Sequence, residues 1–369
     1  MGIKSKIDQL APEEQWVLQT VLHSEVSKIP LPHNLEYSHT FALKNGLAPY
    51  LFKQLNHSKS IRTNELIASL KKDYLTSFIR NTIHLTVWEE VKTLFKEHHL
   101  SPIPLKGLVL ATQVYTDPAL RPMSDLDILF LEDQAQTAFD LLLKYGGSSH
   151  QQEAGHDKKT GHQLPGLTYK GVLIEIHRTL FDTDIQYNIP NVYLKDFLFQ
   201  KKGITTFTPE INFIYFCLHA YHTMRRGGIR ISWFLDLILL SQKEHLNTEI
   251  LIKHLNALAL LEPIQLITSQ TEFLFRYAFD FIPDHFKRVL TEKEQNDLIR
   301  LIHHSDQQNT DFSYSIALER LKNTKGIKNK MSFLRSVLSS DKDGNKNIIT
   351  RTMSLIYKLS KYYLNKLKS

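Results

Sequence analysis

The sequence predicts an α+β protein in which a mixed sheet and its helices are flanked by helical regions on both sides. The first observation is the distribution of glycine: ten of the 14 glycines fall between Gly107 and Gly228, and residues 229–325 contain none. Because glycine marks turns and tight backbone, we expect the middle of the chain to be rich in loops and strands. The second observation is the three-and-four spacing of apolar residues in both flanks, which indicates amphipathic helices.

The flanking helices follow from this spacing. The clearest is Asn64–His99, where apolar side chains recur from Ile67 to Phe95. Further helices are predicted over Ala11–His23, Ser38–Leu55, 210–240 and 247–281. Pro209 precedes the third of these regions and Pro263 interrupts the fourth.

The middle of the chain alternates strand and helix patterns. In order, these are an apolar run at Ile103–Leu105, a helix-like stretch at Gly107–Tyr115, a strand at Ser124–Leu131, a helix at Asp133–Tyr145 that ends at Gly146-Gly147, and a hairpin of Gln163–Tyr169 with Val172–His177 around Lys170-Gly171. This order predicts a mixed sheet in an α+β core. The predicted organisation is an N-terminal helical region (1–100), the α+β core (101–205), a helical domain that completes the cleft (206–319) and a basic helical tail (320–369).

Charge and cysteine content exclude some classes of protein. The 369 residues carry a net charge of +7, but residues 320–369 hold 13 Lys or Arg against two Asp, a net of +11. Residues 1–319 therefore sum to about −4, so a nucleic-acid-binding protein that is basic throughout is disfavoured. The single Cys217 excludes an intramolecular disulfide framework and a Cys-rich zinc site.

The chain is predicted to be cytoplasmic. Met1–Gln15 is polar and unlike a signal peptide, and the apolar stretch Ile231–Leu240 is short and interrupted by Asp236. Residues 347–368 have the pattern of a basic amphipathic helix, which would either hold the protein peripherally at the inner membrane face or dock on the body with its lysines in water. RNA binding is disfavoured because no platform of aromatic and basic residues accompanies the charge.

The candidate site begins with two aspartates on a predicted strand. Asp125 and Asp127 are two residues apart, so they point to the same face with Cα atoms about 6–7 Å apart. Glu175 interrupts the apolar strand Val172–His177, and it would be a third carboxylate on that face if the two strands are neighbours. Converging carboxylates repel one another unless a divalent ion is present or one takes up a proton, and they are what metal-assisted phosphoryl transfer requires. The structural alternatives are an Asp-X-Asp at a strand end and a solvent-facing glutamate in a hairpin.

These residues resemble a known family. Leu105-Lys106-Gly107, Tyr115, the segment Leu120–Asp127 and Glu175-Ile176-His177 look like the uncharacterised bacterial nucleotidyltransferases of the DNA polymerase β-like superfamily. The resemblance continues through His39–Leu51, Asn81, His219, His222 and Arg230–Asp236, and covers about residues 10–245.

The resemblance implies roles for individual residues. Asp125 and Asp127 match the metal-binding pair and Glu175 the third acidic position, as a ligand of a second ion or as a general base, with Mg²⁺ or Mn²⁺ as the metal. Where the superfamily usually has Gly-Ser, this chain has Lys106-Gly107, so Gly107 is expected to offer backbone N–H groups to a phosphate and Lys106 and Arg121 to supply charge. Ser124 and His177 complete the expected substrate-binding set.

The implied activity is the transfer of a nucleoside monophosphate from a nucleoside triphosphate, expected to be ATP, with release of pyrophosphate. The acceptor would be a hydroxyl or a phosphate on a small molecule, sugar or peptide. The alternative is a non-catalytic regulator or scaffold that keeps the fold, with or without a membrane contact through its tail.

Other polar residues have two interpretations each. His177 would contact a metal or the substrate, or be a structural histidine, and His219 and His222 would be zinc ligands, or core or pocket-lining residues. Asp236 on an apolar helix requires a partner, for which Arg230, Arg225 and Arg226 are the candidates. Residues 155–166 would form either a lid or a solvated hairpin end.

Overall fold

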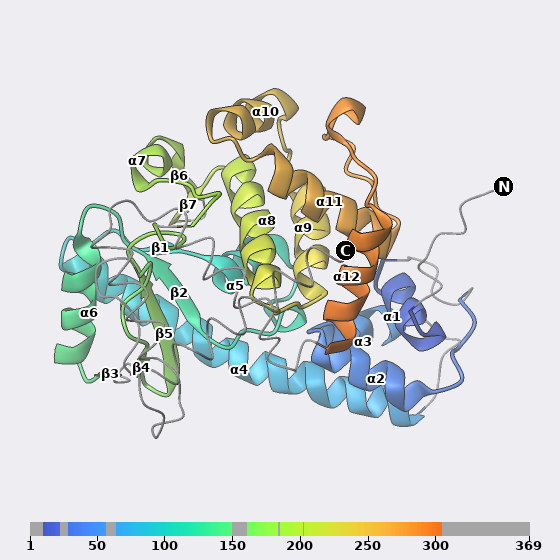
Figure 1. Cartoon of the computed structure of the whole chain (residues 1–369). Coiled ribbons are helices and arrows are strands. Elements are labelled where there is room, and N and C mark those ends of the chain that lie inside the picture. The colour runs from blue at the N-terminus through green and yellow to red at the C-terminus, as the bar shows by residue number, and fades with distance from the viewer. Residues whose placement is uncertain are drawn as a thin grey trace, which may run out of the picture.

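The computed structural model describes residues 10–22, 29–56, 64–149, 161–183, 185–201 and 203–304. A sheet with its helix α6 lies on one side of the molecule, a body of helices lies on the other, and the long helix α4 runs along both (Figure 1). The predicted α+β fold class is confirmed. The domain boundaries stay predictions, and the basic tail predicted over residues 320–369 lies outside the described residues.

The main sheet has the strand order β1-β2-β5-β4-β3. Its central strands, β2 (Leu126–Leu129) and β5 (Val172–His177), run parallel. The strands β1, β4 and β3 are Ile103–Pro104, Leu167–Tyr169 and Ser148–Ser149. This arrangement makes the predicted strands of Asp127 and Glu175 direct neighbours.

The predicted hairpin is confirmed. β4 pairs antiparallel with β5, and the two-residue turn Lys170-Gly171 has positive φ at both positions, which matches the twist of a tight hairpin. β4 is shorter than predicted, because Gln163 makes only an isolated bridge to His177.

The helices beside the sheet also follow the prediction in outline. The stretch predicted over Gly107–Tyr115 is helix α5 (Lys106–Val109) followed by a π-helical turn, Leu110–Val114. Helix α6 (Gln134–Lys144) ends next to Gly146, whose φ of +97° favours glycine.

The N-terminal region contains α1 (Pro12–Leu22), α2 (Leu35–Lys44), α3 (Ala48–Asn56) and α4 (Asn64–Glu97). The single helix predicted over Ser38–Leu55 was wrong, because the chain breaks between α2 and α3. Gly46 stands there at φ +70°, a left-handed conformation that ends helices, and a Cβ at this position would lie 3.0 Å from Ser232 Oγ.

The region predicted as two helical stretches after residue 206 contains more breaks. It comprises α8 (Pro209–Arg225), α9 (Ser232–Lys243), α10 (Thr248–Ala257), α11 (Leu261–Phe275) and α12 (Glu292–His304). Before it come α7 (Asn191–Leu194) and a separate hairpin of β6 (Leu198–Lys201) and β7 (Ile204–Phe207). Gly227-Gly228 separates α8 from α9, a break that apolar periodicity alone does not reveal.

Two hydrophobic cores meet along α4. Leu66 and Leu70 at its N-terminal end pack into a core shared by helices α1–α3 and α8–α12. Trp88, Val91 and Phe95 at its C-terminal end pack into the core between the sheet and α6. Helix α4 therefore ties the helical body to the sheet. Among the described residues, no helix combines the length and apolarity needed to cross a bilayer.

Asn81 holds the loop that leads into β2. Its side-chain amide donates to the carbonyl oxygens of Pro118 (2.6 Å) and Arg121 (2.9 Å) and accepts from the N–H of Met123 (3.2 Å). The side chain is buried in α4, so this loop is fastened to the helix that joins the two cores.

We expect Asn81→Ala to lower the free energy of unfolding by about 2–4 kcal/mol, because it leaves three buried backbone groups without partners. Urea unfolding measures this, with Thr82→Ala as the control: Thr82 is exposed and its hydroxyl only bonds back to Phe78 O. Equal losses in the two variants would contradict a specific role for the Asn81 contacts.

Candidate functional site

Strand alternation directs the acidic residues toward the helical body. Leu126 and Ile128 of β2 and Ile174 and Ile176 of β5 point into the core beneath α6. The intervening side chains therefore project from the opposite face of the sheet. Because Asp127 pairs with Glu175 across the parallel strands, their carboxylates lie side by side.

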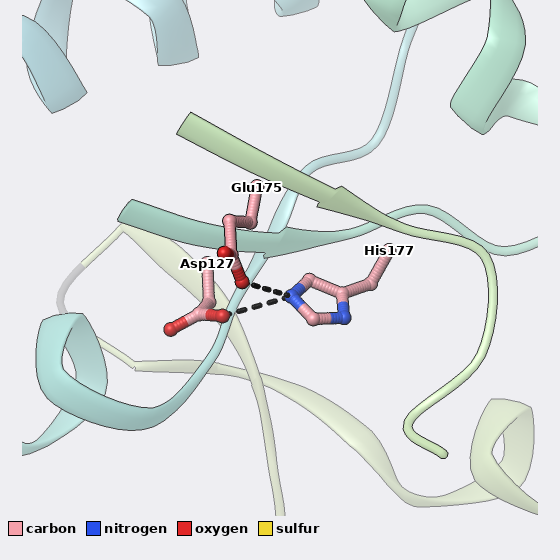
Figure 2. Close-up of side chains that lie close together, drawn as sticks. All are labelled: Asp127, Glu175 and His177. Carbon is pink, nitrogen blue, oxygen red and sulfur yellow. Dashed lines mark hydrogen bonds and ion pairs between the residues drawn. The ribbon is translucent and has the colours of Figure 1, made fainter. Parts of the chain in front are cut away.

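His177 joins the two carboxylates (Figure 2). Its Nε2 lies 2.8 Å from Asp127 Oδ1 and 3.8 Å from Glu175 Oε2. One ligand atom of each residue falls within 4.8 Å of the others, so the group could hold a metal ion. The Asp127 side chain is 3% exposed and that of Glu175 is 22% exposed, so Glu175 does not face open solvent as one of the structural alternatives supposed.

Lys106 supplies a positive charge to this group. Its Nζ lies 2.6 Å from Asp127 Oδ1, and its backbone has a φ of +44°, which is unfavourable for a residue with a side chain. Burial would lower the pKa of Lys106, but the charge of Asp127 outweighs it and holds the pKa above its usual value. The lysine is therefore charged and bound to the carboxylate.

Asp125 lies at the entrance of β2, one residue before the strand. Ser124 donates a side-chain hydrogen bond to it. Burial, followed by the charge of Asp127, raises the pKa of Asp125, which places the two carboxylates in one electrostatic environment. Asp125 is not part of the three-residue group with His177, although its charge also raises the pKa of Glu175.

The carboxylates of Asp127 and Glu175 respond to this crowding in opposite ways. Burial and then the charge of Asp127 raise the pKa of Glu175 to about 7. Burial also acts to raise the pKa of Asp127, but Lys106 and the bond from His177 hold it well below its usual range. In the absence of a cation, Glu175 thus relieves the repulsion by taking up a proton near neutral pH.

His177 is neutral at pH 7. Burial lowers its pKa to about 4 against the opposing effect of Asp127. With the Asp127 carboxylate as acceptor, Nε2 carries the proton, which leaves Nδ1 as a buried nitrogen without a hydrogen-bond partner in the described structure.

A cavity of about 550 Å³ opens beside Glu175 and Lys106. Cationic and imidazole side chains surround it, and the wall opposite the sheet is formed by α8. Its polar lining consists of Lys106, Gln136, His162, Gln163, Glu175, Arg178, Asp182, His219, His222, Thr223 and Arg226. A negatively charged ligand would find complementary charge there.

A family model described as an uncharacterised nucleotidyltransferase matches residues 37–276, well over half of the chain. The chain belongs to this family. The match contains the whole of β2 and β5 and the cavity-lining helix α8. The chain has no significant match among curated proteins or among solved structures.

In this member of the nucleotidyltransferase family, Arg121 binds Asp236 on α9. Arg121 Nη2 lies 3.0 Å from Asp236 Oδ2, and the Tyr115 hydroxyl donates to Asp236 Oδ1 at 2.7 Å. The three partners predicted for Asp236 from the sequence were wrong, because Arg121 and Tyr115 bind its carboxylate. Both lie more than 100 residues before Asp236 in the chain, whereas the predicted arginines are its near neighbours. The buried pair links the loop before β2 to the helical body.

Gly107 makes room for that link. A Cβ at this position would lie 3.1 Å from Arg121 Nη1 and 3.1 Å from Met123 Cγ. Side chains of the loop before β2 thus fill the space beside Gly107 in α5, which gives this glycine a packing role in addition to the phosphate-binding role expected from the resemblance.

Tyr215 is the functional candidate that the sequence analysis missed. Its hydroxyl is buried on α8 without a hydrogen-bond partner among the described residues. Burial raises the pKa of Tyr215, and the nearby charges of Asp127, Glu175 and Asp125 act in the same direction against that of Lys106. A signal existed: Tyr215, His219 and His222 are spaced by four and three within a largely apolar stretch, and Arg226 follows four residues later.

The two α8 histidines line the cavity, as one of their predicted alternatives states. His222 Nε2 lies 2.8 Å from the carbonyl oxygen of Tyr187, and His219 packs edge-on against Trp233. Neither belongs to a group with metal-ligand geometry within the described part of the chain. Of the predicted lid, residues 155–160 lie outside the described residues, whereas residues 161–165 line the cavity.

His222 makes the stability of the fold depend on pH. Burial lowers its pKa to about 4, from about 6.5 in an unfolded chain. Between these two pH values the unfolded state binds the proton and the folded state does not. The contribution of His222 to the free energy of unfolding is therefore fully present above pH 6.5 and decreases as the pH falls below that value. We expect this residue alone to contribute a loss of up to about 1.4 kcal/mol per pH unit.

His222→Gln should remove that part of the slope in urea unfolding measured from pH 7 to pH 4.5. The exposed His285 is the control position, and His285→Gln should keep the wild-type slope. An unchanged slope in His222→Gln would show that His222 binds its proton equally well in the folded and unfolded states.

Proposed function

We propose that this chain is a metal-dependent nucleotidyltransferase that transfers a nucleoside monophosphate from ATP or another nucleoside triphosphate to a hydroxyl or phosphate acceptor. The observation that carries the proposal is the pairing of Asp127 with Glu175 across parallel strands, at the mouth of a cavity lined by cationic side chains. The acceptor class stays open among small molecules, sugars and peptides.

The donor set fits a hard divalent cation such as Mg²⁺ or Mn²⁺. Asp125, Asp127 and Glu175 offer carboxylate oxygens, the ligands these ions prefer. Burial and then the charge of Asp127 raise the pKa values of Asp125 and Glu175, and a bound cation would offset the repulsion from Asp127. When bound, the ion would neutralise triphosphate charge and polarise the phosphorus that is attacked.

The cavity supports binding of the nucleotide. Arg178 lies directly after β5 and Arg226 directly after α8, so phosphate oxygens would meet cations from the ends of these elements as well as Lys106 of α5. Leu164, Leu180 and Phe181 supply apolar lining for a base. These residues bind and orient the nucleotide.

Glu175 is the proposed proton acceptor. It is the carboxylate of the three that lines the cavity, and therefore the one that an acceptor hydroxyl would reach. The acceptor oxygen forms a bond to the α-phosphorus, the bond to pyrophosphate breaks, and the hydroxyl proton passes to the Glu175 carboxylate.

One observation favours the second candidate, a non-catalytic regulator with the same fold. Lys106 Nζ already occupies a position against Asp127, where it partly replaces a metal charge. A protein that keeps this ion pair permanently would bind a partner without chemistry, and the metal dependence of nucleotide binding distinguishes the two functions.

We expect Mg²⁺ or Mn²⁺ with ATP to raise the thermal unfolding temperature of the wild type, and expect either component alone to raise it less. Asp125→Asn and Glu175→Gln should lose most of the metal-dependent part of the shift. They should also lower transfer of label from α-³²P-ATP by at least about 100-fold. Label from γ-³²P-ATP should not be transferred.

Glu132→Gln is the control, because Glu132 is an exposed carboxylate that pairs with Lys195 outside the site. Identical ATP shifts with and without metal in wild type and Glu175→Gln would contradict the catalytic assignment. Transfer from the γ-position would replace it with a kinase activity.

Tyr215 gives a test in which two measurements move in opposite directions. Its unpaired hydroxyl weakens the free protein, so Tyr215→Phe should leave the free energy of unfolding equal or raise it by up to about 1 kcal/mol. If the hydroxyl donates to a bound phosphate oxygen, the same variant should weaken ATP binding about tenfold.

The matched control is Tyr115→Phe, which removes a hydroxyl that is bonded to buried Asp236 and should destabilise the free protein by about 1–3 kcal/mol. Unfolding in urea and calorimetric titration with ATP measure both effects. A destabilised Tyr215→Phe with unchanged ATP affinity would assign Tyr215 to the fold alone.

A further inference from the structure

The outer face of α4 carries large apolar side chains. Leu75, Phe78, Ile79 and Ile83 are 45% to 60% exposed, and they are neighbours on two successive turns. Thr76 and Thr82 bond their hydroxyls back to helix carbonyls, so their methyl groups add to the apolar surface. Clustered exposure of this kind marks an interaction site more often than scattered single residues do.

Charges of opposite sign stand at the two ends of this stripe. Lys71 and Lys72 lie on its N-terminal side, and Glu89 and Glu90 on its C-terminal side. Lys72 and Glu90 are 18 residues apart, which is five helical turns and about 27 Å, so they share the azimuth of the stripe. The glutamate side chains are 62% and 40% exposed while they contact Lys92 and Lys170.

The charge pattern of this stripe is complementary to that of a second α4 that runs in the opposite direction. If a second α4 packs antiparallel, with the two-fold axis near position 81, each basic end meets an acidic end. Ile79 of one copy then faces Ile83 of the other, in the isologous arrangement of a two-fold dimer. Apolar contact in the centre and opposite charges at the rim are the usual composition of such interfaces.

We propose that the outer face of α4 is the interface of a homodimer, in which two α4 helices pack antiparallel through Ile79 and Ile83. An anionic membrane is the competing occupant for an apolar helix face with lysines. Glu89 and Glu90 are ion-paired with Lys92 and Lys170 of their own chain, so this end of the stripe is close to neutral and offers an anionic membrane no net attraction, whereas a second copy places Lys71 and Lys72 against two exposed carboxylates. The charge pattern therefore favours the second copy.

The interface borders the candidate site. A groove of about 510 Å³ lies between α4 and the β4–β5 turn, lined by Ile79, Ile83, Ser124 and Val172 among others. Ser124 precedes Asp125 in the chain, so a second copy seated on α4 would lie close to the start of β2.

Sedimentation velocity of the full chain over a concentration series tests the proposal. We expect the wild type to form a reversible dimer at protein concentrations of tens of micromolar. The dissociation constant of the dimer should be at least about 100-fold larger for Ile79→Glu. Val192→Glu is the control, because Val192 is a large exposed apolar residue on α7, away from α4. A wild type that stays monomeric throughout this range overturns the proposal. If this monomeric protein also floats with phosphatidylglycerol vesicles, the outer face of α4 binds a membrane instead of a second copy.

A charge exchange tests the antiparallel geometry. Lys71→Glu/Lys72→Glu and Glu89→Lys/Glu90→Lys should each weaken self-association, because like charges meet twice in each homodimer. An equimolar mixture of the two variants should recover a mixed dimer, since every basic end then meets an acidic one. A mixture as monomeric as its components overturns the antiparallel arrangement.

Discussion

Parallel pairing of β2 with β5 sets Asp127 against Glu175 on the face of the sheet that looks toward the helical body, and the residues around them compensate for that crowding. Two ionised carboxylates at this distance and burial would repel strongly. Lys106 and His177 both bind Asp127 Oδ1, which keeps that group ionised. Burial and then the charge of Asp127 raise the pKa of Glu175 to about 7. Asp127 thus stays negatively charged, whereas Glu175 gains or loses its charge near neutral pH.

Compensation of this kind requires a rigid surrounding, because a charge that drifts by a few ångströms loses most of its effect. Lys106 reaches Asp127 from a left-handed backbone conformation that costs energy and persists only where the structure around it is well determined. Arg121 and Asp236 supply part of that structure, since their buried ion pair joins the loop before β2 to α9. Removing either partner alone would strand a buried charge, which costs more than the pair contributes.

Local patterns in the sequence predicted what depends on local physics. The alternation in β2 and β5, the Lys170-Gly171 turn and the amphipathic period of α4 each reflect neighbours in the chain, and they led to the carboxylate group as a hypothesis. The partner of Asp236 and the position of Tyr215 depend on how α8 and α9 pack against the sheet, which periodicity does not encode. The break at Gly46 was missed because the apolar period continues across it, although a glycine in the left-handed region is a signal that ends helices.

Helix α4 shows how a single element serves two environments. Its period of 3.6 residues gives it an inner face, where Asn81 bonds the loop before β2, and an outer face, where Ile79 and Ile83 are exposed only two residues away on either side. Its two halves belong to different cores, so bending α4 would disturb both at once. A partner on the outer face would therefore act on the site through a stiff support rather than through a flexible loop, and its effect would appear as a change in how firmly the loop before β2 is held.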